Sequence, residues 1–481
     1  MHRDQLPIAA LTPWSKLNDV AFIDSSVQEL GESRGFGLLT NRALSSKNSY
    51  DIPTLLDVSH DLILSAEAIE EHVKVDQHFR ELMEVAGGKS LRSDILLFLL
   101  MQITIASNQG VNVGVQNPWT EYCRILPGYV PVPTLWSDEE RILLVGTSLE
   151  PALSAKMSAL ARELDELRER TTNIAWCQKY WWEHDALSIT EWALLDAWYR
   201  SRSLELPNAG ESMVPCLDMA NHSSEPNSYY EQGSSNNVLL LLRPDVTLDD
   251  SSEITISYGD AKSEAEMLFS YGFIDESSVK ARGLVLPLDT FPEDPLGKAK
   301  VSAFIGQPKI HISADQDNIQ WDSPFLYLMC LNEEDGLQFK VLQQTDGSRS
   351  SLRVFWQGSD VTDVTDTFET LINIHEFQDV FKLRVVSSLQ SRIGQQLERL
   401  AEGDEMVQSL ASMVQITPDV QRHALQLRAS EKSILQKAYA TVDMQKTSLL
   451  ESKVVLRYLG VASDEDKPEQ AETNNEEEDF S

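Results

Sequence analysis

The sequence has few of the residues that mark secreted, zinc-binding or nucleic-acid-binding proteins. Its four cysteines are far apart and form no Cys-x-x-Cys pair, which argues against a disulfide framework and against a zinc site. Lys and Arg number 40 against 75 Asp and Glu, so the net charge is −35 and direct binding to nucleic acid is not expected. A surface of this sign either attracts basic partners, such as a lysine-rich protein, or only keeps the chain soluble.

Long apolar runs are also absent. The most apolar stretch, residues 95–106, is interrupted by Gln102 and Thr104 and is too short to span a membrane. The amino terminus has charged residues between short apolar pieces, so neither a signal peptide nor a transmembrane helix is expected. With so few cysteines, the chain is predicted to work in a reducing compartment, the cytoplasm and/or the nucleus.

The apolar pattern changes twice along the 481 residues, which are too many for one compact core and predict two or three domains. From about residue 55 to 204 the spacing is helical, and a run of apolar residues spaced by 4, 4, 3, 4 and 3 between Leu149 and Leu167 predicts one helix face. After residue 214 the pattern resembles strands, and a sheet is expected to carry Tyr258 and Tyr271.

The last part of the chain returns to helical spacing. Residues 377–400 and 418–456 predict two long helices, after a stretch of mixed, proline-containing sequence. The tail holds nine acidic residues from position 464 onward and lacks apolar side chains until Phe480, so it is expected to be disordered.

One predicted helix places an arginine among large apolar side chains. Ser188 and Glu191 form a capping box at its start, and Trp192, Leu195, Tyr199 and Arg202 follow at intervals of three or four. Because a guanidinium keeps its proton, Arg202 needs an anion if this face is buried. The alternative is an arginine at a helix carboxyl end with its stem packed.

A polar turn follows an apolar stretch at residues 214–220 that is expected to be buried. The side chains of Asn221 and His222 there need hydrogen-bond partners, and a bound ligand is one source of them. Near the amino terminus, Gly35 and Gly37 bracket Phe36, where the backbone can approach a ligand closely. A hydrolase triad of Asp218, His222 and Ser223 is not supported, because the chain has no Gly-x-Ser-x-Gly elbow.

Four ordered blocks resemble those of the SET-domain protein lysine methyltransferases, in the branch of the Rubisco large-subunit and ribosomal-protein lysine methyltransferases. The blocks are Arg-Gly-Phe-Gly at 34–37, Arg-Ser-Arg at 200–202, the segment 213–223 ending in Asn-His-Ser, and the tyrosine-bearing segments 253–259 and 268–273. The thirteen-residue spacing from Tyr258 to Tyr271 also resembles the family. The order of the blocks, the insert and the carboxyl-terminal helices resembles that of the family over roughly residues 20–460.

The resemblance implies an α+β fold with a mostly β SET core, knot-like threading near Asn221 and His222, a helical insert and a mostly helical carboxyl-terminal domain. The expected SET domain is 1–285, with its core split between about 20–50 and 200–280 and the insert at about 51–199. A substrate-binding domain is expected at 286–460, and the acidic tail at 461–481.

The resemblance also implies S-adenosylmethionine as methyl donor and no metal. The residues expected to bind it are Arg34, Gly35, Phe36, Arg202, Asn221, His222 and Tyr258. Within this set, Arg202 would meet the cofactor carboxylate.

The resemblance implies that Tyr258 and Tyr271 take part in the catalysis of lysine methylation. A lysine ammonium has a reference pKa of about 10.4 and must lose a proton before its nitrogen attacks the methyl group. The tyrosines are expected to line the lysine channel. The further residues expected at the substrate are Asp218, Phe273 and either Tyr229 or Tyr230.

The sequence after Phe273 contains a single cysteine, Cys330. It therefore lacks the zinc-binding cysteine cluster that is common in the histone-directed members of the family that it resembles. A non-histone protein substrate of basic character, a ribosomal protein being one candidate, is therefore predicted, with no membrane or nucleic-acid partner. The alternative is a catalytically inactive SET-fold module that binds other proteins.

Overall fold

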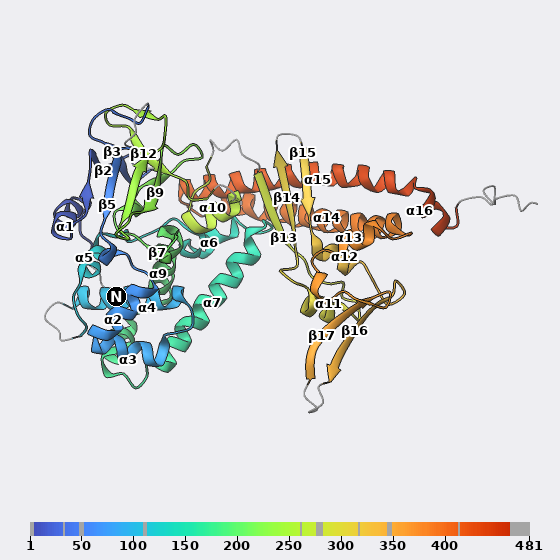
Figure 1. The fold of residues 1–481 in the computed structure, drawn as a ribbon, viewed down its shortest axis with the longest axis horizontal. Helices are drawn as coiled ribbons and strands as arrows, with labels where there is room; N and C mark the ends of the chain where they lie inside the picture. Colours follow the sequence, from blue (N-terminus) through green and yellow to red (C-terminus); the bar gives the residue numbers. More distant parts are fainter. Residues whose placement is uncertain are drawn as a thin grey trace, which may run out of the picture. The chain divides into compact units, whose positions relative to one another are not determined.

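The structure is a computed structural model that describes residues 4–31, 34–47, 52–108, 113–259, 262–275, 282–315, 318–343, 349–411 and 414–461. It divides into two compact units (Figure 1). Unit 1 comprises Met1–Lys280 and Leu400–Glu431, and unit 2 comprises Ala281–Arg399 and Lys432–Ser481. The predicted tail lies almost wholly outside the described residues.

The described residues of unit 1 form four small sheets, whose strands come from both ends of its first segment. The first has the order β1 (Ala21–Phe22), β5 (Thr54–Val58), β10 (Val238–Leu242) and β9 (Ser228–Gln232), and the second has the order β2 (Ser25–Glu29), β3 (Phe36–Thr40), β12 (Glu253–Ile256) and β8 (Asn221–His222). The two-stranded sheets pair β4 (Leu44–Ser45) with β11 (Thr247–Leu248), and β6 (Ser203–Leu206) with β7 (Gly210–Met213). All these pairs are antiparallel except β8 with β12, which is parallel.

Strand β5 corrects the expectation that helical structure starts at about residue 51. Residues 54–58 pair with β1 on one side and with β10 on the other, so this segment belongs to a sheet. Three of its five side chains are fully buried. A short apolar run of this kind does not distinguish a buried strand from the start of a helix by periodicity.

Helices form most of the insert and lie mainly below the sheets of unit 1 in the view of Figure 1. They are α2 (Ala66–Val75), α3 (Gln77–Ala86), α4 (Leu91–Ser107), α5 (Pro118–Ile125), α6 (Asp138–Ile142), α7 (Leu149–Arg170), α8 (Ala175–Cys177) and α9 (Ile189–Arg202). Two more lie outside the insert, α1 (Leu11–Leu17) and α10 (Glu264–Tyr271). The apolar face predicted between Leu149 and Leu167 is confirmed, because both residues are buried on α7.

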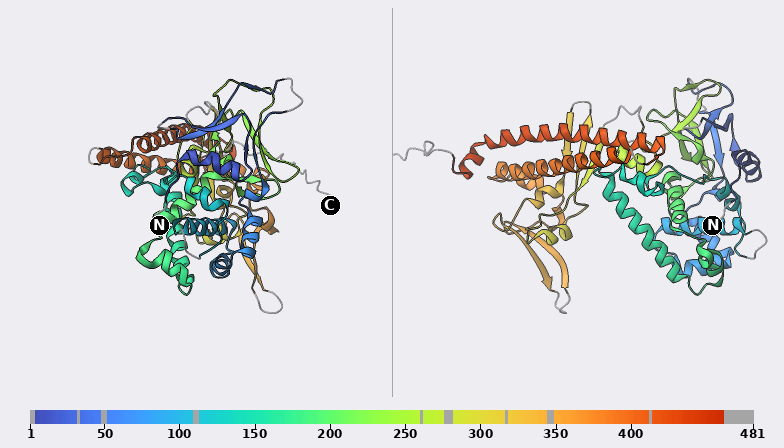
Figure 2. Two further views of the ribbon diagram at one scale, coloured as in Figure 1. Left: turned by 90° about the vertical axis from the view of Figure 1, so that its left-hand side faces the viewer. Right: turned by 180° about the vertical axis from the view of Figure 1, so that it is seen from behind.

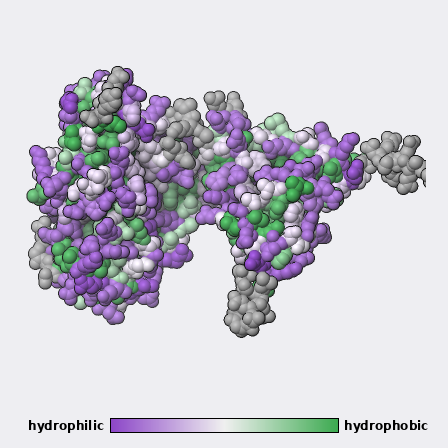
Figure 3. Space-filling model, viewed as in Figure 1, coloured by the Kyte–Doolittle hydropathy of each residue, from purple (hydrophilic) through white to green (hydrophobic). Residues whose placement is uncertain are grey.

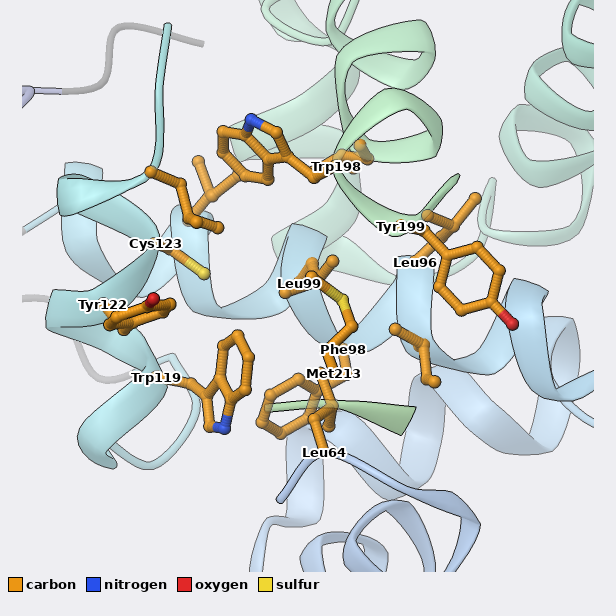
Figure 4. Close-up of a cluster of buried hydrophobic side chains, with 14 of the residues drawn as sticks. Leu64, Leu96, Phe98, Leu99, Trp119, Tyr122, Cys123, Trp198, Tyr199 and Met213 are labelled. Carbon is orange, nitrogen blue, oxygen red and sulfur yellow. The ribbon is translucent and has the colours of Figure 1, made fainter. Parts of the chain in front are cut away.

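The main core of unit 1 is built around α4, which is apolar on all sides and buried from Ile95 to Ile105. Figure 4 shows Leu96, Phe98 and Leu99 of α4 packed among aromatic side chains of α5 and α9. The same cluster contains Met213 of β7. Because β7 directly precedes the segment 214–223, this core fixes the place of the predicted site.

Helix α9 begins at the predicted capping box. The Ser188 hydroxyl accepts a hydrogen bond from the backbone N–H of Glu191, and the Glu191 carboxylate accepts one from the backbone N–H of Ser188 at 2.8 Å. Every residue from Trp192 to Tyr199 except Leu194 is buried. The helix ends at Arg202, where β6 begins, so a rigid element delivers Arg202 to the site.

Unit 2 contains two three-stranded antiparallel sheets and several helices (Figure 2). The strands are β13 (Arg282–Pro287), β14 (Lys309–Asp315), β15 (Asn318–Asp322), β16 (Leu337–Gln343), β17 (Arg349–Trp356) and β18 (Ser359–Asp360). The helices are α11 (Gly297–Ala303), α12 (Pro324–Met329), α13 (Phe368–Asn373) and α16 (Lys453–Tyr458). Two long helices, α14 (Gln378–Ala411) and α15 (Pro418–Leu450), are divided between the units.

The two long helices agree with the helical spacing of residues 377–400 and 418–456, and the strands agree with the mixed sequence before them. The predicted fold class, α+β, is confirmed. Hydrophilic residues predominate on the molecular surface seen in Figure 3. Among the described residues, no helix is both long enough and apolar enough to cross a bilayer.

Candidate active site

The site is organised by the parallel pair β8 and β12. Asn221 and His222 lie beside Thr255 and Ile256, and the backbone N–H of Ser223 donates to the Ile256 carbonyl oxygen at 3.0 Å. The chain leaves β12 and reaches Tyr258 two residues later. The polar turn after residue 220 and the first predicted tyrosine therefore meet at the end of one sheet.

Several of the predicted cofactor residues lie around Glu253, the first residue of β12. The Asn221 side-chain amide donates to the Glu253 carboxylate at 3.0 Å and to the Phe36 carbonyl oxygen at 3.2 Å. The Arg34 guanidinium forms an ion pair with the same carboxylate. A Cβ atom at Gly37 would lie 2.6 Å from Leu30 Cδ1 and 2.8 Å from the Asn221 amide nitrogen, so a larger residue there would displace these side chains. Sequence reasoning missed Glu253, whose partners are distant in sequence.

Arg202 finds its anion in Asp218. Its Nη1 donates to the Asp218 carboxylate at 2.9 Å and to the Asp218 carbonyl oxygen at 3.1 Å. The side chains are only 17% and 3% exposed. Burial opposes the charge of Arg202, but the Asp218 carboxylate more than offsets this and raises the pKa of the guanidinium.

This pair refines the expectation that the anion beside Arg202 is a cofactor carboxylate. The protein supplies one anion itself, yet the Arg202 Nε is buried and has no hydrogen-bond partner among the described residues. A second acceptor can therefore be bound there.

Tyr122 holds the Asp218 side chain in place through a hydrogen bond. Its hydroxyl donates to the Asp218 carboxylate and accepts a hydrogen bond from the backbone N–H of Cys216 at 2.9 Å. Burial, and then the charge of Asp218, raises the pKa of this hydroxyl. Tyr122 lies on α5 and is 96 residues from Asp218, so no local sequence signal marks it.

Tyr258 is held at both its backbone and its hydroxyl. The hydroxyl donates to the Ala220 carbonyl oxygen at 2.9 Å, and the backbone N–H donates to Nδ1 of His222 at 3.1 Å. Burial is the main cause that raises the pKa of the Tyr258 hydroxyl. The group therefore stays protonated at neutral pH.

The ring of Tyr271 lies close to that of Tyr258 and is tilted by 33° to it. Their ring centroids are 4.6 Å apart, and the Tyr271 hydroxyl donates to the Tyr258 carbonyl oxygen at 3.3 Å. Burial, with a smaller contribution from Tyr230, raises the pKa of Tyr271 to about 12. Phe273 lies 6.4 Å from each of the rings of Tyr258 and Tyr271.

The prediction that a sheet carries both tyrosines is wrong for Tyr271, which ends helix α10. This helix starts at a capping box formed by Ser263 and Glu266 and stops at Gly272, which has φ +83°. The segment 268–273 is short and rich in apolar residues, a pattern that does not separate strand from helix.

A cavity of about 610 Å³ lies beside this cluster. Its lining includes Arg202, Asp218, Tyr230, Tyr258 and Tyr271. Of the two neighbours on β9 left open by the sequence, Tyr230 lines the cavity, whereas the lining does not include Tyr229. The structure thus places one set of predicted residues in the cavity.

The remaining predicted residues lie elsewhere around β8 and β12. Arg34, Phe36 and Asn221 surround Glu253, while His222 contacts the rings of Tyr258 and Phe273, with centroid distances of 5.3 Å and 6.1 Å. Residues 220–222 and 256–258 join the two groups. In the part of the chain that the structure describes, no group of three or more His, Cys, Asp or Glu side chains is placed to hold a metal ion.

Among known proteins, the chain is similar to SET-domain proteins and to Rubisco large-subunit N-methyltransferases. No family model matches the chain. It is 27% identical to the SET domain-containing protein 8 of Schizosaccharomyces pombe over 425 residues, 86% of this chain and 91% of that protein. It is 23% identical to the chloroplastic Rubisco large-subunit N-methyltransferase of Nicotiana tabacum over 342 residues, 68% of this chain and 64% of that protein.

Solved structures show the same fold. The SET domain of LSMT bound to lysine and AdoHcy superimposes with a TM-score of 0.66 at 17% identity, covering 95% of this chain and 96% of that one. Rubisco LSMT bound to AdoMet gives a TM-score of 0.66 at 17% identity, covering 95% and 97%. The chain therefore has the SET-domain fold, and it resembles the Rubisco large-subunit branch of the SET-domain lysine methyltransferases.

Proposed function

We propose that this protein is an S-adenosylmethionine-dependent protein lysine N-methyltransferase. The observation that carries the proposal is the cavity in which Tyr230, Tyr258 and Tyr271 meet next to the Arg202–Asp218 pair. Similar structures hold lysine with AdoHcy, or AdoMet, in the same fold.

The residues present fit the proposed cofactor. S-adenosylmethionine would supply a methyl group activated by a sulfonium. The buried Nε of Arg202 is a spare donor suited to a carboxylate. Asn221 donates its side-chain amide to the Glu253 carboxylate and to the Phe36 carbonyl oxygen, so the backbone at Phe36 lies next to it. We assign Arg202, Asn221 and the segment at Phe36 to cofactor binding.

The cavity is suited to bind a neutral lysine amine. A lysine ammonium with a reference pKa of about 10.4 is disfavoured where it is desolvated. Aromatic walls from Tyr230 and Tyr271 desolvate it. Tyr258, whose hydroxyl donates to the Ala220 carbonyl oxygen, lines the same cavity. Positioning of two reactants in this way supplies roughly 7–11 kcal/mol of a barrier.

The substrate is proposed to be a non-histone protein with basic character, a ribosomal protein being one candidate. Two observations support this. The chain carries a net charge of −35, which attracts basic proteins, and its relatives in Nicotiana and Pisum are named for a non-histone substrate, the Rubisco large subunit.

The proposal is tested by methyl transfer to proteins. Purified protein is incubated with a protein extract and S-adenosylmethionine labelled in the methyl group, and the labelled proteins are hydrolysed to amino acids. Label in methylated lysine, absent when Tyr258→Phe replaces the wild type, is the expected result. A folded, cofactor-binding protein that labels no lysine would instead point to an interaction module.

A further inference from the structure

One side chain of the helical insert reaches the site from outside the cavity. Tyr122 lies on α5, is fully buried and is not part of the cavity lining. Figure 4 shows its ring near that of Trp119, whose centroid is 5.3 Å away, and the centroid of the Trp14 ring is 4.8 Å away. Each of these indole N–H groups donates to a backbone carbonyl oxygen at 3.0 Å. Neighbours that are themselves anchored therefore hold the ring of Tyr122 in place.

The hydroxyl of Tyr122 makes two hydrogen bonds to the segment that carries Asp218. It accepts from the backbone N–H of Cys216 at 2.9 Å and donates to Oδ1 of Asp218. Cys216 is buried and has φ +70°, a strained conformation that persists only where the surrounding contacts impose it. Burial is the largest cause that raises the pKa of the hydroxyl, so the group keeps the proton that it donates. Tyr122 therefore holds both the turn and the carboxylate that follows it.

The two carboxylate oxygens of Asp218 have different partners. Oδ1 accepts from Tyr122, whereas Oδ2 accepts from Nη1 of Arg202 at 2.9 Å. The same nitrogen also donates to the Asp218 carbonyl oxygen at 3.1 Å, so both of its N–H groups are used on Asp218. The buried Nε of Arg202 has no partner among the described residues. Because Arg202 lines the cavity, its Nε remains as a donor for a ligand.

The hydroxyl of Tyr122 limits how Asp218 can hold Arg202. A carboxylate with two free oxygens frequently accepts two parallel hydrogen bonds from a guanidinium. Asp218 is only 3% exposed, so without the phenol its Oδ1 would lack a donor, and a second bond from Arg202 would satisfy it. That bond would turn the guanidinium and change which N–H groups remain for a ligand. The bond from Tyr122 to Oδ1 therefore keeps Arg202 on one carboxylate oxygen.

We infer that Tyr122 is a positioning residue for the methyl donor: by occupying one oxygen of Asp218, it leaves the Nε of Arg202 available to the carboxylate of S-adenosylmethionine. The inference rests on the proposed function and adds a residue of the helical insert to it. Tyr122 acts through Asp218 and Arg202, without contacting the cofactor. The affinity for the cofactor carboxylate then depends on a hydroxyl that is 96 residues from Asp218 in the sequence.

The test compares two ligands that differ only in the carboxylate, S-adenosylmethionine and decarboxylated S-adenosylmethionine. Calorimetric titration gives the dissociation constant of each for the wild type and for Tyr122→Phe, with no substrate and no turnover. Tyr327→Phe is the matched control. Tyr327 is also buried and has the Glu369 carboxylate near its hydroxyl, but it lies on α12 in unit 2 and outside the cavity lining. Circular dichroism and thermal unfolding check that each variant is folded.

The wild type should bind S-adenosylmethionine more tightly than the decarboxylated ligand. Tyr122→Phe should weaken binding of S-adenosylmethionine by roughly tenfold, because a hydrogen bond between charged groups is misaligned, and should change binding of the decarboxylated ligand by less than about twofold. Tyr327→Phe should keep the preference of the wild type. A variant that is merely loosened would bind both ligands more weakly and keep the ratio of the two dissociation constants.

A second measurement covers the case in which Tyr122→Phe does not fold. 3-Fluorotyrosine at position 122 keeps the ring and the hydroxyl, and its fluorine resonance reports on the surroundings of the phenol. The resonance should shift when S-adenosylmethionine binds, because the cofactor carboxylate then shares Arg202 with Asp218. It should shift much less when the decarboxylated ligand binds.

Three results would overturn the inference. They are an unchanged ratio of the two dissociation constants in Tyr122→Phe, a wild type that binds both ligands equally, and a fluorine resonance that responds to both ligands alike. In each of these S-adenosylmethionine still binds, so the proposed function stands. A folded wild type that binds neither ligand would contradict the proposed function and, with it, the role of Tyr122.

Discussion

The Tyr258 hydroxyl donates a hydrogen bond to the carbonyl oxygen of Ala220, two residues before His222. His222 in turn accepts a hydrogen bond from the backbone N–H of Tyr258. These two contacts lock the strand end that carries Tyr258 onto the turn that carries the predicted cofactor residues. The orientation of the phenol is therefore fixed before any ligand binds.

Tyr258→Phe should lower methyl transfer by about 10²-fold or more, because the proposed function places this hydroxyl at the reacting groups. Binding of S-adenosylmethionine should persist. Initial rates with labelled cofactor, compared with calorimetry on the same sample, check both expectations. Tyr229→Phe is the control, since Tyr229 precedes Tyr230 on β9 but is not part of the cavity lining. Equal losses in the two variants would contradict the role given to Tyr258.

Asp218→Asn should reduce the free energy of unfolding by about 3 kcal/mol, because it leaves the buried Arg202 guanidinium without its counter-charge. Urea unfolding followed by circular dichroism measures this. Asp419→Asn, which breaks an exposed ion pair with Arg422, should change stability little. Similar stabilities for the two variants would mean that the Arg202–Asp218 pair is well solvated.

Gly272→Ala should destabilise the protein and weaken activity. A Cβ atom there would lie 2.7 Å from the backbone of Pro131, and the φ of +83° is strained for alanine. The end of α10, and with it Tyr271, would have to move. Gly88→Ala is the matched control, because Gly88 has φ +75° but nothing within 4 Å of its added Cβ. The melting temperature and kcat of the first variant should fall below those of the second.

Glu431 predicts a pH dependence of stability. It accepts hydrogen bonds from the backbone N–H and hydroxyl of Ser148, yet burial, the largest cause, raises its pKa to about 7. The folded protein holds this proton more tightly than the unfolded chain does. The contribution of Glu431 to the free energy of unfolding is therefore largest below about pH 4.5 and is lost as the pH rises to about 7. Over this whole window the loss is roughly 3 kcal/mol.

Glu431→Gln should remove that dependence, so the variant gains stability relative to wild type as pH rises through the window. Denaturant unfolding at several pH values measures the difference. The exposed Glu402→Gln variant should instead follow the wild type. If the free energies of unfolding of Glu431→Gln and wild type differed by the same amount at every pH in this range, the Glu431 carboxyl would not be protonated more readily in the folded state.

Local sequence blocks predicted a set of residues that the structure brings together around β8 and β12, but they did not predict the contacts that hold these residues. The tyrosines and the Asn221–His222 turn could be found because each lies in a short, ordered motif. The contacts of Tyr122 and Glu253 could not, because Tyr122 contacts Asp218 from 96 residues away, and Glu253, although it opens one of the blocks, contacts Arg34 from 219 residues away. Such pairings depend on how the helical insert and the sheets fold together.

Element type was hardest to predict in short apolar segments. The run at residues 54–58 became a strand of the core sheet, and the run ending at Tyr271 became a helix, although both have few residues and little periodicity. By contrast, α7 and α9 were predictable, because a long apolar stripe marks the first and a capping box marks the second.

The proposed function requires that the region of Arg202 and Asn221 bind S-adenosylmethionine. Calorimetric titration of the purified protein with S-adenosylmethionine tests this requirement, because no substrate is needed. Saturable binding at one site, weakened in Asn221→Ala while that variant stays folded, is the expected result. Absence of binding by a folded wild-type sample would contradict the proposed function and favour an interaction module.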